Sequence, residues 1–308
     1  MEDKVLVFGH KNPDTDSICS SIVMADLANK LGYNAEPVRL GSLNKESEFA
    51  LNAAGVEAQR QISKVEEGEK LILVDHNEAG QSVDGRENAE VVMVIDHHRI
   101  SDFSTNNPLY YIAKPYGCTS TILYELYKQH DFDISKEMAT LMLSAIISDT
   151  LLLKSPTCTE KDVEALNELE KIAEVNASEY GLELLKAGTD LSEYTSQEVI
   201  NLDAKEVDGN GKKIVIAQVN AAQIDDVYSR KEELSFAIEK EISDRELDLF
   251  VFVITDIINS NSKLMCFGNE KAVCEKAFGV ELDEEDTMFL EGVVSRKKQI
   301  LPKILENI

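Results

Sequence analysis

Short apolar runs recur along the first half of the chain. The runs at 4–8, 71–75 and 91–96 end in polar residues or are followed closely by them, and their apolar sequences predict buried strands. Shorter runs at 38–40 and 109–113 predict two further strands. Because helical stretches separate most of these runs, we expect a parallel sheet with right-handed crossovers.

Amphipathic stretches between the runs predict the helices of this half. The first starts at Asp16 or Ser17, either of which can cap it, and continues to about Leu31, before Gly32. The other helices are expected at about 44–54, 118–129, 135–148, 160–173 after a Thr159–Asp162 capping box, and 178–187. These elements predict an α/β domain over residues 1–188, with helices flanking its parallel sheet.

The pattern changes after residues 189–195, a polar stretch that we interpret as a linker. A strong turn signal at 208–211 separates two strand-like runs, and the apolar run 249–254 predicts a core strand. Further elements are expected at 213–219, 222–244 (a long helix), 263–267, 270–278 (a helix) and 292–295. The second domain, 196–308, is therefore expected to be a smaller mixed-sheet α/β domain.

The charge of the chain excludes one class of partner. With 31 basic and 57 acidic residues, the net charge is −26. Such a surface repels phosphate backbones, which argues against a general nucleic-acid-binding protein. A small anionic substrate is still compatible, provided that a metal ion or a local basic cluster reverses the field.

The cysteines, the N-terminal sequence and the length of the apolar runs indicate the cellular compartment. The five cysteines are odd in number and lack paired zinc-ligand spacing, so we expect buried thiols. The N-terminus has no signal-peptide pattern, and no apolar run is long enough for a membrane helix. We therefore expect a cytoplasmic protein with no membrane partner.

Metal-capable side chains follow three of the predicted strands. They are His10, Asp14 and Asp16 after the first, Asp75-His76-Asn77 after the run at 71–75, and Asp96-His97-His98 at the end of the run at 91–96. In an open parallel sheet, ligands bind beyond the carboxyl ends of the strands, so the three groups should meet at one edge. Taken singly, a lone histidine or an aspartate at a helix start is more often structural. The repeated placement favours a metal site.

The ligand types indicate which metal binds. Two carboxylates as close as Asp14 and Asp16 cannot both stay ionised in a buried turn unless they share a cation. Imidazoles with carboxylates and no thiolate suit Mn²⁺, Fe²⁺, Co²⁺ or Zn²⁺ better than Ca²⁺, and the excess of acids favours Mn²⁺. So many acids also suggest two ions, joined by a bridging carboxylate about 3.5–4 Å apart.

These residues resemble a known family. His10-x-x-x-Asp14-x-Asp16, Asp75-His76-Asn77, Asp96-His97-His98 and Ser148-Asp149-Thr150 resemble the signature motifs of the DHH phosphoesterase superfamily. Ser295-Arg296-Lys297-Lys298 narrows the resemblance to the family II, manganese-dependent inorganic pyrophosphatases. One motif alone would be weak, but the set follows the family in order over essentially the whole chain.

The resemblance implies a role for each motif residue. One ion would be held by His10, Asp14 and Asp75, and the other by Asp16, Asp75, His97 and Asp149, with Asp75 bridging. His98 would donate a proton to the leaving phosphate, and Lys205, Arg296 and Lys297 of the second domain would bind phosphate oxygens. Asp96 is expected to hydrogen-bond a liganding group and fix its orientation.

The implied reaction is hydrolysis of pyrophosphate to two phosphates. A metal-bridging hydroxide at a dinuclear manganese site between the two domains would attack phosphorus, with the linker letting the domains close. The implied cofactors are two Mn²⁺ per subunit, with Co²⁺ possible in their place, and Mg²⁺ entering with the substrate. The implied assembly is a homodimer joined through the N-terminal domain, with the strand at 109–113 as the edge that pairs.

The bases of the second domain carry a weaker signal of their own. Guanidinium and ammonium groups are the usual phosphate ligands, and three consecutive bases are unusual in a chain of net charge −26. A helix start with solvated lysines explains the run equally well without the first domain. Lys205 carries no signal apart from the resemblance.

Three other functions remain open. An exopolyphosphatase of the same superfamily is the closest, and phosphate release from polyphosphate would distinguish it. A nuclease is disfavoured, because the chain has no Trp and 6% aromatic residues, and shows no aromatic-rich basic groove. A non-catalytic metal-binding protein would bind Mn²⁺ but release no phosphate.

Overall fold

The chain folds into two compact units in a computed structural model that describes residues 4–308. The division falls between Ala187 and Gly188. Residues 189–195 form neither helix nor strand. The first three residues, part of the N-terminus without a signal-peptide pattern, lie outside the described residues.

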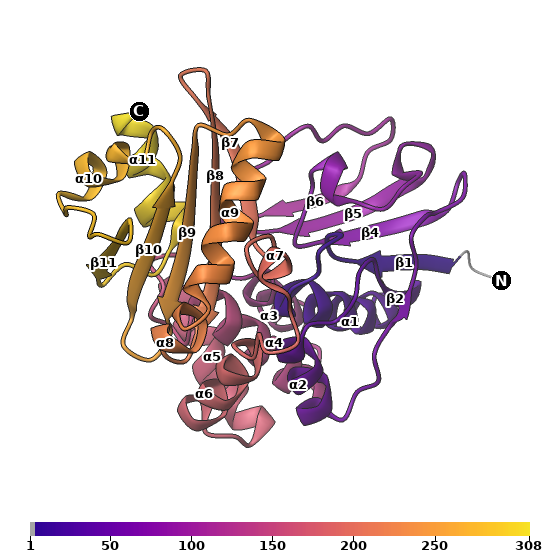
Figure 1. Ribbon diagram of the computed structural model, residues 1–308. Helices are drawn as coiled ribbons and strands as arrows, with labels where there is room; N and C mark the ends of the chain where they lie inside the picture. The colour runs from indigo at the N-terminus through magenta and orange to yellow at the C-terminus, as the bar shows by residue number, and fades with distance from the viewer. Residues whose placement is uncertain (1–3) are drawn as a thin grey trace. The chain divides into compact units, whose positions relative to one another are not determined.

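The first unit is built on a six-stranded parallel sheet (Figure 1). Its strands are β1 (Lys4–Phe8), β2 (Asn34–Arg39), β3 (Arg60–Gln61), β4 (Lys70–Val74), β5 (Glu90–Asp96) and β6 (Tyr110–Ala113). Their order is β3-β2-β1-β4-β5-β6, and every neighbouring pair is parallel. The order therefore reverses between β1 and β4, the place where open α/β sheets bind their ligands.

The central strands are buried on both faces, which explains their unbroken apolar sequences. The last four residues of β1 and of β4 are all buried. One face lies against helices, whereas Leu6, Phe8 and Leu73 pack with residues of the loops on the other face, such as Val65 and Val83. Covered in this way, the two strands present only their carboxyl ends to a ligand.

The helices of the first unit confirm most of the sequence predictions. Their bounds are α1 (Thr15–Lys30), α2 (Lys45–Ala54), α3 (Thr119–Gln129), α4 (Lys136–Thr150), α5 (Glu160–Ala173) and α6 (Ala177–Gly188). The Thr159–Asp162 capping box at the start of α5 is present. The predicted cap of α1 was wrong, because Oδ1 of Asp14, and not Asp16 or Ser17, accepts the N–H of Ser17 at 2.9 Å.

Helix α4 carries Asp149 in its last turn and is buried continuously from Ala139 to Ile147. It packs against α1, α2, α3 and α5. It ends abruptly at Leu151, Leu152 and Leu153, which have φ of 48°, 53° and 64°. Residues other than glycine rarely adopt this left-handed backbone conformation, so the surrounding structure must hold the turn in place. A fixed end to α4 also fixes the position of Asp149.

The second unit contains a five-stranded mixed sheet. Its strands are β7 (Ala204–Gly209), β8 (Lys212–Ala221), β9 (Leu249–Asp256), β10 (Asn261–Phe267) and β11 (Thr287–Glu291), in the order β11-β10-β9-β8-β7. Only β8 and β9 are parallel; the other pairs are antiparallel. The predicted fold class, α/β with a parallel and then a mixed sheet, is confirmed.

Helices cover both faces of this second sheet. They are α7 (Ser196–Val199), α8 (Ile224–Tyr228), α9 (Lys231–Arg245), α10 (Ala272–Phe278), the π-helical turn η3 (Arg296–Ile300) and α11 (Leu301–Asn307). Alternate residues of β9 face opposite ways: Phe250 and Phe252 pack in the core that includes α9, and Val251 in the core with α10 and α11. The fully buried β9 is therefore the centre of the unit.

Two predictions for the second unit were wrong. The long helix expected over 222–244 is divided at Arg230, whose guanidinium donates to the carbonyls of Leu191 and Tyr194 and so holds the break in place. The strand expected at 292–295 lies instead at 287–291. Gly292, with φ of 69°, ends that strand.

Other sequence predictions agree with the structure. The turn at 208–211 is a hairpin in which Asn210 and Gly211 both have positive φ, as a two-residue type I′ turn requires. None of the five cysteines is in a disulfide; four are buried, but Cys158 is only partly buried, contrary to expectation. Within residues 4–308, the helices are too short or too polar to cross a bilayer.

Candidate metal centre

The first group of metal-capable side chains lies between β1 and α1. Nε2 of His10 is 3.3 Å from Oδ2 of Asp14 and 3.5 Å from Oδ2 of Asp75. This close approach depends on Gly9, because a Cβ there would lie 2.5 Å from Cβ and Oγ of Ser17. The residues His10, Asp14 and Asp75 offer ligand atoms that all lie within 4.8 Å of one another.

Asp75 follows β4 and is the central residue of the site. It is 1% exposed and has φ of 60°, a left-handed conformation that aspartate tolerates better than most residues. Its Oδ2 faces His10, whereas its Oδ1 lies 3.3 Å from Nε2 of His97. One carboxylate therefore contributes one oxygen to each of two neighbouring groups.

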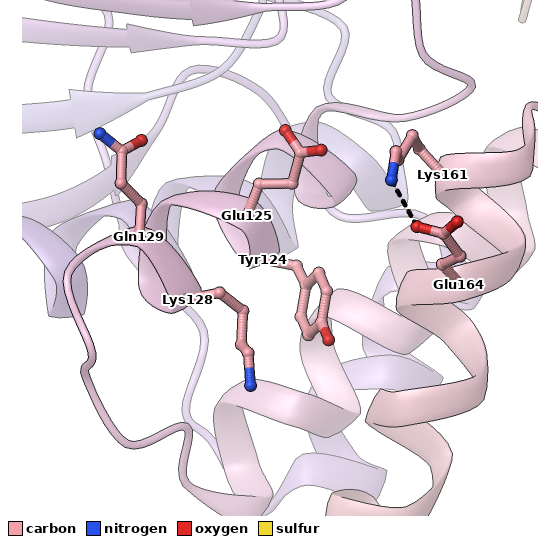
Figure 2. Close-up of a pocket in the computed structure, with 6 residues that line it drawn as sticks. All are labelled: Tyr124, Glu125, Lys128, Gln129, Lys161 and Glu164. Carbon is pink, nitrogen blue, oxygen red and sulfur yellow. Dashed lines mark hydrogen bonds and ion pairs between the residues drawn. The ribbon is translucent and has the colours of Figure 1, made fainter.

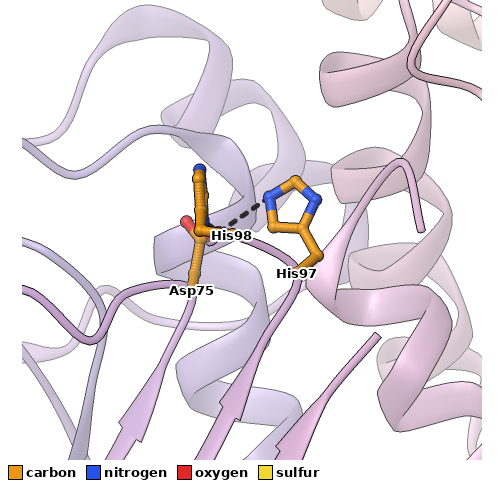
Figure 3. Close-up of side chains that lie close together, drawn as sticks. All are labelled: Asp75, His97 and His98. Atoms are coloured by element: carbon orange, nitrogen blue, oxygen red, sulfur yellow. Dashed lines mark ion pairs between the residues drawn. The ribbon is translucent and has the colours of Figure 1, made fainter. Parts of the chain in front are cut away.

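The paired histidines His97 and His98 follow β5 and lie close to Asp75 (Figure 3). Nε2 of His97 is 3.3 Å from Asp75 and 3.7 Å from Oδ2 of Asp149. The other ring nitrogen of His97 lies 3.1 Å from the carbonyl oxygen of Tyr116, which fixes the ring and directs Nε2 toward the acids. His98 offers Nδ1 to Oδ1 of Asp96 at 3.0 Å.

Asp16 and Asp149 complete the site on the side of the helices. Together with the thiol of Cys118, their carboxylates form a third group whose ligand atoms lie within 4.8 Å of one another. Asp16 is fully buried, and the Asp149 side chain is 16% exposed. In contrast, the side chains of Asp14 and His98 are 49% and 37% exposed, so these two residues form the solvent-facing side of the site.

The acids of the site cannot all be ionised without cations. Burial, reinforced by the charge of Asp75, raises the pKa of Asp16 to about 6. Burial, reinforced by Asp16, raises the pKa of Asp149 well above its usual range. Burial alone would also raise the pKa of Asp75, but its contacts with the histidines His97, His98 and His10 outweigh burial and lower it.

The histidines respond to the same negative field. Burial lowers the pKa of His10, but the carboxylates of Asp14 and Asp75 outweigh it and raise the pKa to about 9. His97 follows the same pattern and also reaches about 9, chiefly through Asp75. In the metal-free chain the imidazolium groups thus take the place of metal cations. The donor set fits divalent ions that accept imidazole and carboxylate together, such as Mn²⁺.

The structure brings together six residues that the sequence analysis assigned to metals. They are His10, Asp14, Asp16, Asp75, His97 and Asp149. Asp96 accepts hydrogen bonds from the backbone N–H of His98 and from Nδ2 of Asn77, at 3.0 and 2.6 Å. Asp96 was expected to orient a metal ligand. Its contact is instead with His98, the residue expected to donate a proton.

His76 is kept out of the cluster. Its ring nitrogens lie 2.9 Å from the carbonyl oxygen of Val74 and 3.0 Å from the hydroxyl of Ser82. Burial lowers the pKa of His76 to about 4, so the ring is neutral at pH 7. His76 is therefore a structural histidine, although it directly follows Asp75.

The bases predicted to bind phosphate lie in the second unit, at β7 and η3. The guanidinium of Arg296 donates to the carbonyl and carboxylate oxygens of Asp203 and, at 3.3 Å, to the carbonyl of Ile216. Ile216 is the residue paired with Lys205, so Arg296 and Lys205 share one end of the sheet. Lys205 and Lys297 are exposed.

The turn that carries these bases is held by two glutamines. Oε1 of Gln299 accepts the N–H groups of Val294 and Ser295, at 2.9 and 3.0 Å. Gln218 accepts the N–H of Arg296 at 3.1 Å and donates to the carbonyl of Val294 at 2.9 Å. The backbone of the Ser-Arg-Lys-Lys motif is therefore fixed before any anion binds.

Several residues that hold the acids in place were not predicted from the sequence. Thr119, Ser17 and Ser20 donate to the carboxylates of Asp16 and Asp75. Glu46 on α2 accepts hydrogen bonds from the hydroxyls of Thr15 and Ser148 and so ties α1 to the end of α4. The predicted turn at 115–119 was the one sequence feature that pointed to any of them. Hydroxyl residues at helix starts are too common to indicate such a role.

A separate hollow lies on the surface of the first unit, between α3 and α5 (Figure 2). It is lined by Tyr124, Glu125, Lys128, Gln129, Lys161 and Glu164. Lys161 pairs with Glu164 at 2.5 Å, and Glu125 pairs with Lys114. Much of its charge is thus neutralised locally, and it contains none of the metal-capable groups.

The fold and the acid–imidazole cluster define a DHH-type phosphoesterase. Residues 4–146 match the DHH family, N-terminal domain, and residues 182–307 match the DHHA2 domain. The chain belongs to the family II, manganese-dependent inorganic pyrophosphatases, as the sequence motifs predicted.

Three relatives carry this assignment. The manganese-dependent inorganic pyrophosphatase of Bacillus subtilis (strain 168) is 54% identical over 305 residues, covering 99% of this chain and 98% of that protein. A probable manganese-dependent inorganic pyrophosphatase of Oceanobacillus iheyensis is 52% identical over 304 residues, covering 99% of both chains. The crystal structure of a putative family II inorganic pyrophosphatase from Methanococcus jannaschii is 40% identical and superposes with a TM-score of 0.82 over 99% of each chain.

Proposed function

We propose that this chain hydrolyses inorganic pyrophosphate to two phosphates with two Mn²⁺ held by the first unit. One observation carries the proposal: Oδ2 of Asp75 faces Nε2 of His10 at 3.5 Å, and its Oδ1 faces Nε2 of His97 at 3.3 Å. A carboxylate placed in this way can serve one ion with each oxygen. The names of the relatives support both the metal and the substrate.

The proposed ligand sets are those that the family resemblance implies, and they divide at Asp75. His10, Asp14 and Asp75 would hold one ion, and Asp16, Asp75, His97 and Asp149 the other. The bound ions would lower the pKa of a water to supply the attacking hydroxide and would neutralise charge on the phosphoryl oxygens. Co²⁺ accepts the same ligand types, and Mg²⁺ is expected to enter with the pyrophosphate.

His98 is the proposed proton donor to the leaving phosphate. Its side chain is 37% exposed, so it can reach a substrate at the solvent-facing side of the site. Its Nδ1 lies 3.0 Å from Oδ1 of Asp96. This contact supports a tautomer with the proton on Nδ1, whose other nitrogen gains a proton when the ring becomes imidazolium and can donate it to a phosphate oxygen.

Lys205, Arg296 and Lys297 of the second unit are the proposed phosphate ligands. A guanidinium has five N–H donors, so the contacts of Arg296 with Asp203 and Ile216 can hold the group while other donors meet an anion. Binding here would offset the repulsion expected between a multiply charged anion and a chain of net charge −26.

We further propose a cytoplasmic homodimer joined through the first unit. β6 is the outermost strand of its sheet, pairing with β5, and Tyr110 on it is 50% exposed. An uncovered edge strand can pair with a second copy. Five thiols without a disulfide support a reducing compartment. Sedimentation of the full chain tests the assembly, because a dimer has twice the 34.3 kDa of one chain.

One experiment tests the activity. The chain is purified with a chelator, reconstituted with Mn²⁺ and assayed for phosphate release from pyrophosphate, with long-chain polyphosphate as a parallel substrate. We expect rapid release from pyrophosphate and little from polyphosphate. Faster release from polyphosphate would establish an exopolyphosphatase, and release from neither would establish a non-catalytic metal-binding protein.

A further inference from the structure

The first turn of α3 touches two of the acids assigned to the metals. We infer that Thr119, together with Ser20 and Ser120, is a positioning element that orients the carboxylates of Asp16 and Asp75 for the ions. This inference rests on the proposed ligand sets. It assigns a role to residues that bind neither metal nor substrate themselves.

Both oxygens of Asp16 are held by hydrogen bonds. The backbone N–H of Thr119 donates to Oδ2 at 2.7 Å, and the hydroxyl of Ser20 donates to Oδ1 at 2.6 Å. The hydroxyl of Ser20 is also 2.7 Å from that of Ser120. A carboxylate held at both oxygens cannot rotate, so the lone pairs that remain for an ion have a fixed direction.

Asp75 is held in the same way by hydroxyl groups from two helices. Oγ of Ser17, on α1, donates to Oδ2 at 2.8 Å, and Oγ1 of Thr119, on α3, donates to Oδ1 at 3.3 Å. Thr119 therefore contacts both acids, Asp16 through its backbone and Asp75 through its side chain. It links Asp16, on α1, to Asp75, at the end of β4.

The start of α3 is built for these contacts rather than for an ordinary cap. Cys118 occupies the N-cap position but makes no side-chain capping hydrogen bond. The N–H of Thr119, one of the donors that a helix start leaves without an intrahelical partner, is satisfied by Asp16 instead.

Burial makes these contacts consequential. Thr119, Ser20 and Ser120 are 0% exposed, and Ser17 is 1% exposed, so water is not at hand to replace a lost donor. Loss of a hydrogen bond in the shell around metal ligands typically reduces metal affinity about 10–100-fold. The inference thus predicts a change in metal binding, apart from any change in stability.

Thr121 supplies a matched control in the same turn. It is also 0% exposed, and its hydroxyl donates at 2.6 Å to Asp162, which belongs to the capping box of α5 and lies away from the metal-capable groups. Thr119→Val and Thr121→Val remove the same atom from the same helix and keep the backbone N–H. Only the first change removes a donor from a proposed metal ligand.

The experiment measures Mn²⁺ binding to the full chain by electron paramagnetic resonance and calorimetry, beside thermal unfolding without metal. We expect Thr119→Val to weaken Mn²⁺ binding about 10–100-fold and Thr119→Ser to restore it. Thr121→Val should lower the unfolding temperature while leaving Mn²⁺ affinity unchanged. Equal Mn²⁺ affinity in Thr119→Val and Thr121→Val would overturn the inference.

Ser20→Ala gives an independent test if Thr119→Val does not fold. It removes a donor from Asp16 alone, so we expect one of the two ions to bind more weakly and the other to bind as before. Unchanged binding of both ions would overturn the positioning role of these hydroxyl groups. The experiment measures metal binding and not activity. If the wild-type chain bound two Mn²⁺ but released no phosphate, the proposed function would be refuted, whereas the variants would still test the inference.

Discussion

Gly9 and Ser17 approach each other so closely that no side chain fits between them. A Cβ at Gly9 would lie 2.5 Å from Oγ of Ser17 and 2.8 Å from its Cα. Oγ of Ser17 accepts the N–H of His10 at 3.3 Å and donates to Asp75 at 2.8 Å. The absence of a side chain at Gly9 is therefore what allows Ser17 of α1 to contact both His10 and Asp75.

Gly9→Ala should displace Ser17 and weaken the site. Overpacking of this kind typically destabilises a protein by about 1–3 kcal/mol, and here the displaced hydroxyl holds Asp75. We expect a lower free energy of unfolding and weaker Mn²⁺ binding, measured by denaturant titration and calorimetry. Gly80→Ala is the control, because a Cβ there meets nothing within 4 Å. Similar behaviour of the two variants would contradict this account.

Asp75→Asn should weaken the binding of both ions. Asparagine keeps the left-handed backbone that residue 75 requires, so the change removes charge with little added strain. We expect a loss of affinity larger than the roughly 10–100-fold seen for residues around metal ligands, measured as metal content after dialysis against defined free Mn²⁺. Asp84→Asn, at an exposed acid paired with Lys11, is the control. Retention of both ions in Asp75→Asn would refute the bridging role.

His98→Gln should keep the metals and lose turnover. Removal of a general acid typically reduces turnover about 10²–10⁴-fold. Metal content measured on the same preparation separates this role from a second possibility, because Nδ1 of His98 also lies 3.6 Å from Asp75. Loss of an ion in His98→Gln would make it a ligand, and normal turnover would remove it from the proton-donor role.

Mn²⁺ binding should release protons at neutral pH. His10 and His97 have pKa values of about 9 in the metal-free chain, raised from 6.5 by the acids around them. Both are protonated at pH 7.5, and an ion can bind only to the neutral imidazole. Calorimetry in buffers of different ionisation enthalpy should detect this release. Binding without proton release at pH 7.5 would contradict the raised pKa values.

The same shifts set a pH dependence with a defined sign. Because the folded pKa lies above the unfolded one, the two histidines stabilise the metal-free fold fully below pH 6.5, and this contribution is lost as the pH rises through about 9. The unfolding temperature of the chelated chain should therefore fall over this window, while apparent Mn²⁺ affinity rises. His130, away from the metal-capable groups, allows a control variant, His130→Gln, with the wild-type profile.

The sequence predicted which metal-capable side chains would meet better than it predicted the residues that hold them in place. Asp75 and His97 could be found because acids and imidazoles rarely follow several apolar runs by chance, and parallel strands place their ends at one edge. Thr119 could not be found, because its role depends on the approach of α3 to α1, which no local pattern encodes. The cap of α1 was missed for a related reason: Asp14 is both a cap and a candidate ligand.

The second unit shows where apolar patterns mislead. Val293 and Val294 suggested a strand, but Gly292 ends β11, and the backbone of the valines bonds to side chains of Ser262 and Gln299. The hydrogen-bond partners of Arg296 could not be predicted from the sequence either. Its partner Asp203 lies 93 positions away, and only the pairing of β7 with β8 brings the two together.

The proposed ligands come from points along the chain as far apart as His10 and Asp149, on both sides of the reversal between β1 and β4. An unfolded chain cannot gather them, so Mn²⁺ held by these residues would bind the native state alone. Free Mn²⁺ at about 100 times its dissociation constant would then add about 2.7 kcal/mol to the free energy of unfolding for each site. Manganese starvation would thus deplete the protein itself through proteolysis, in addition to silencing the molecules that survive.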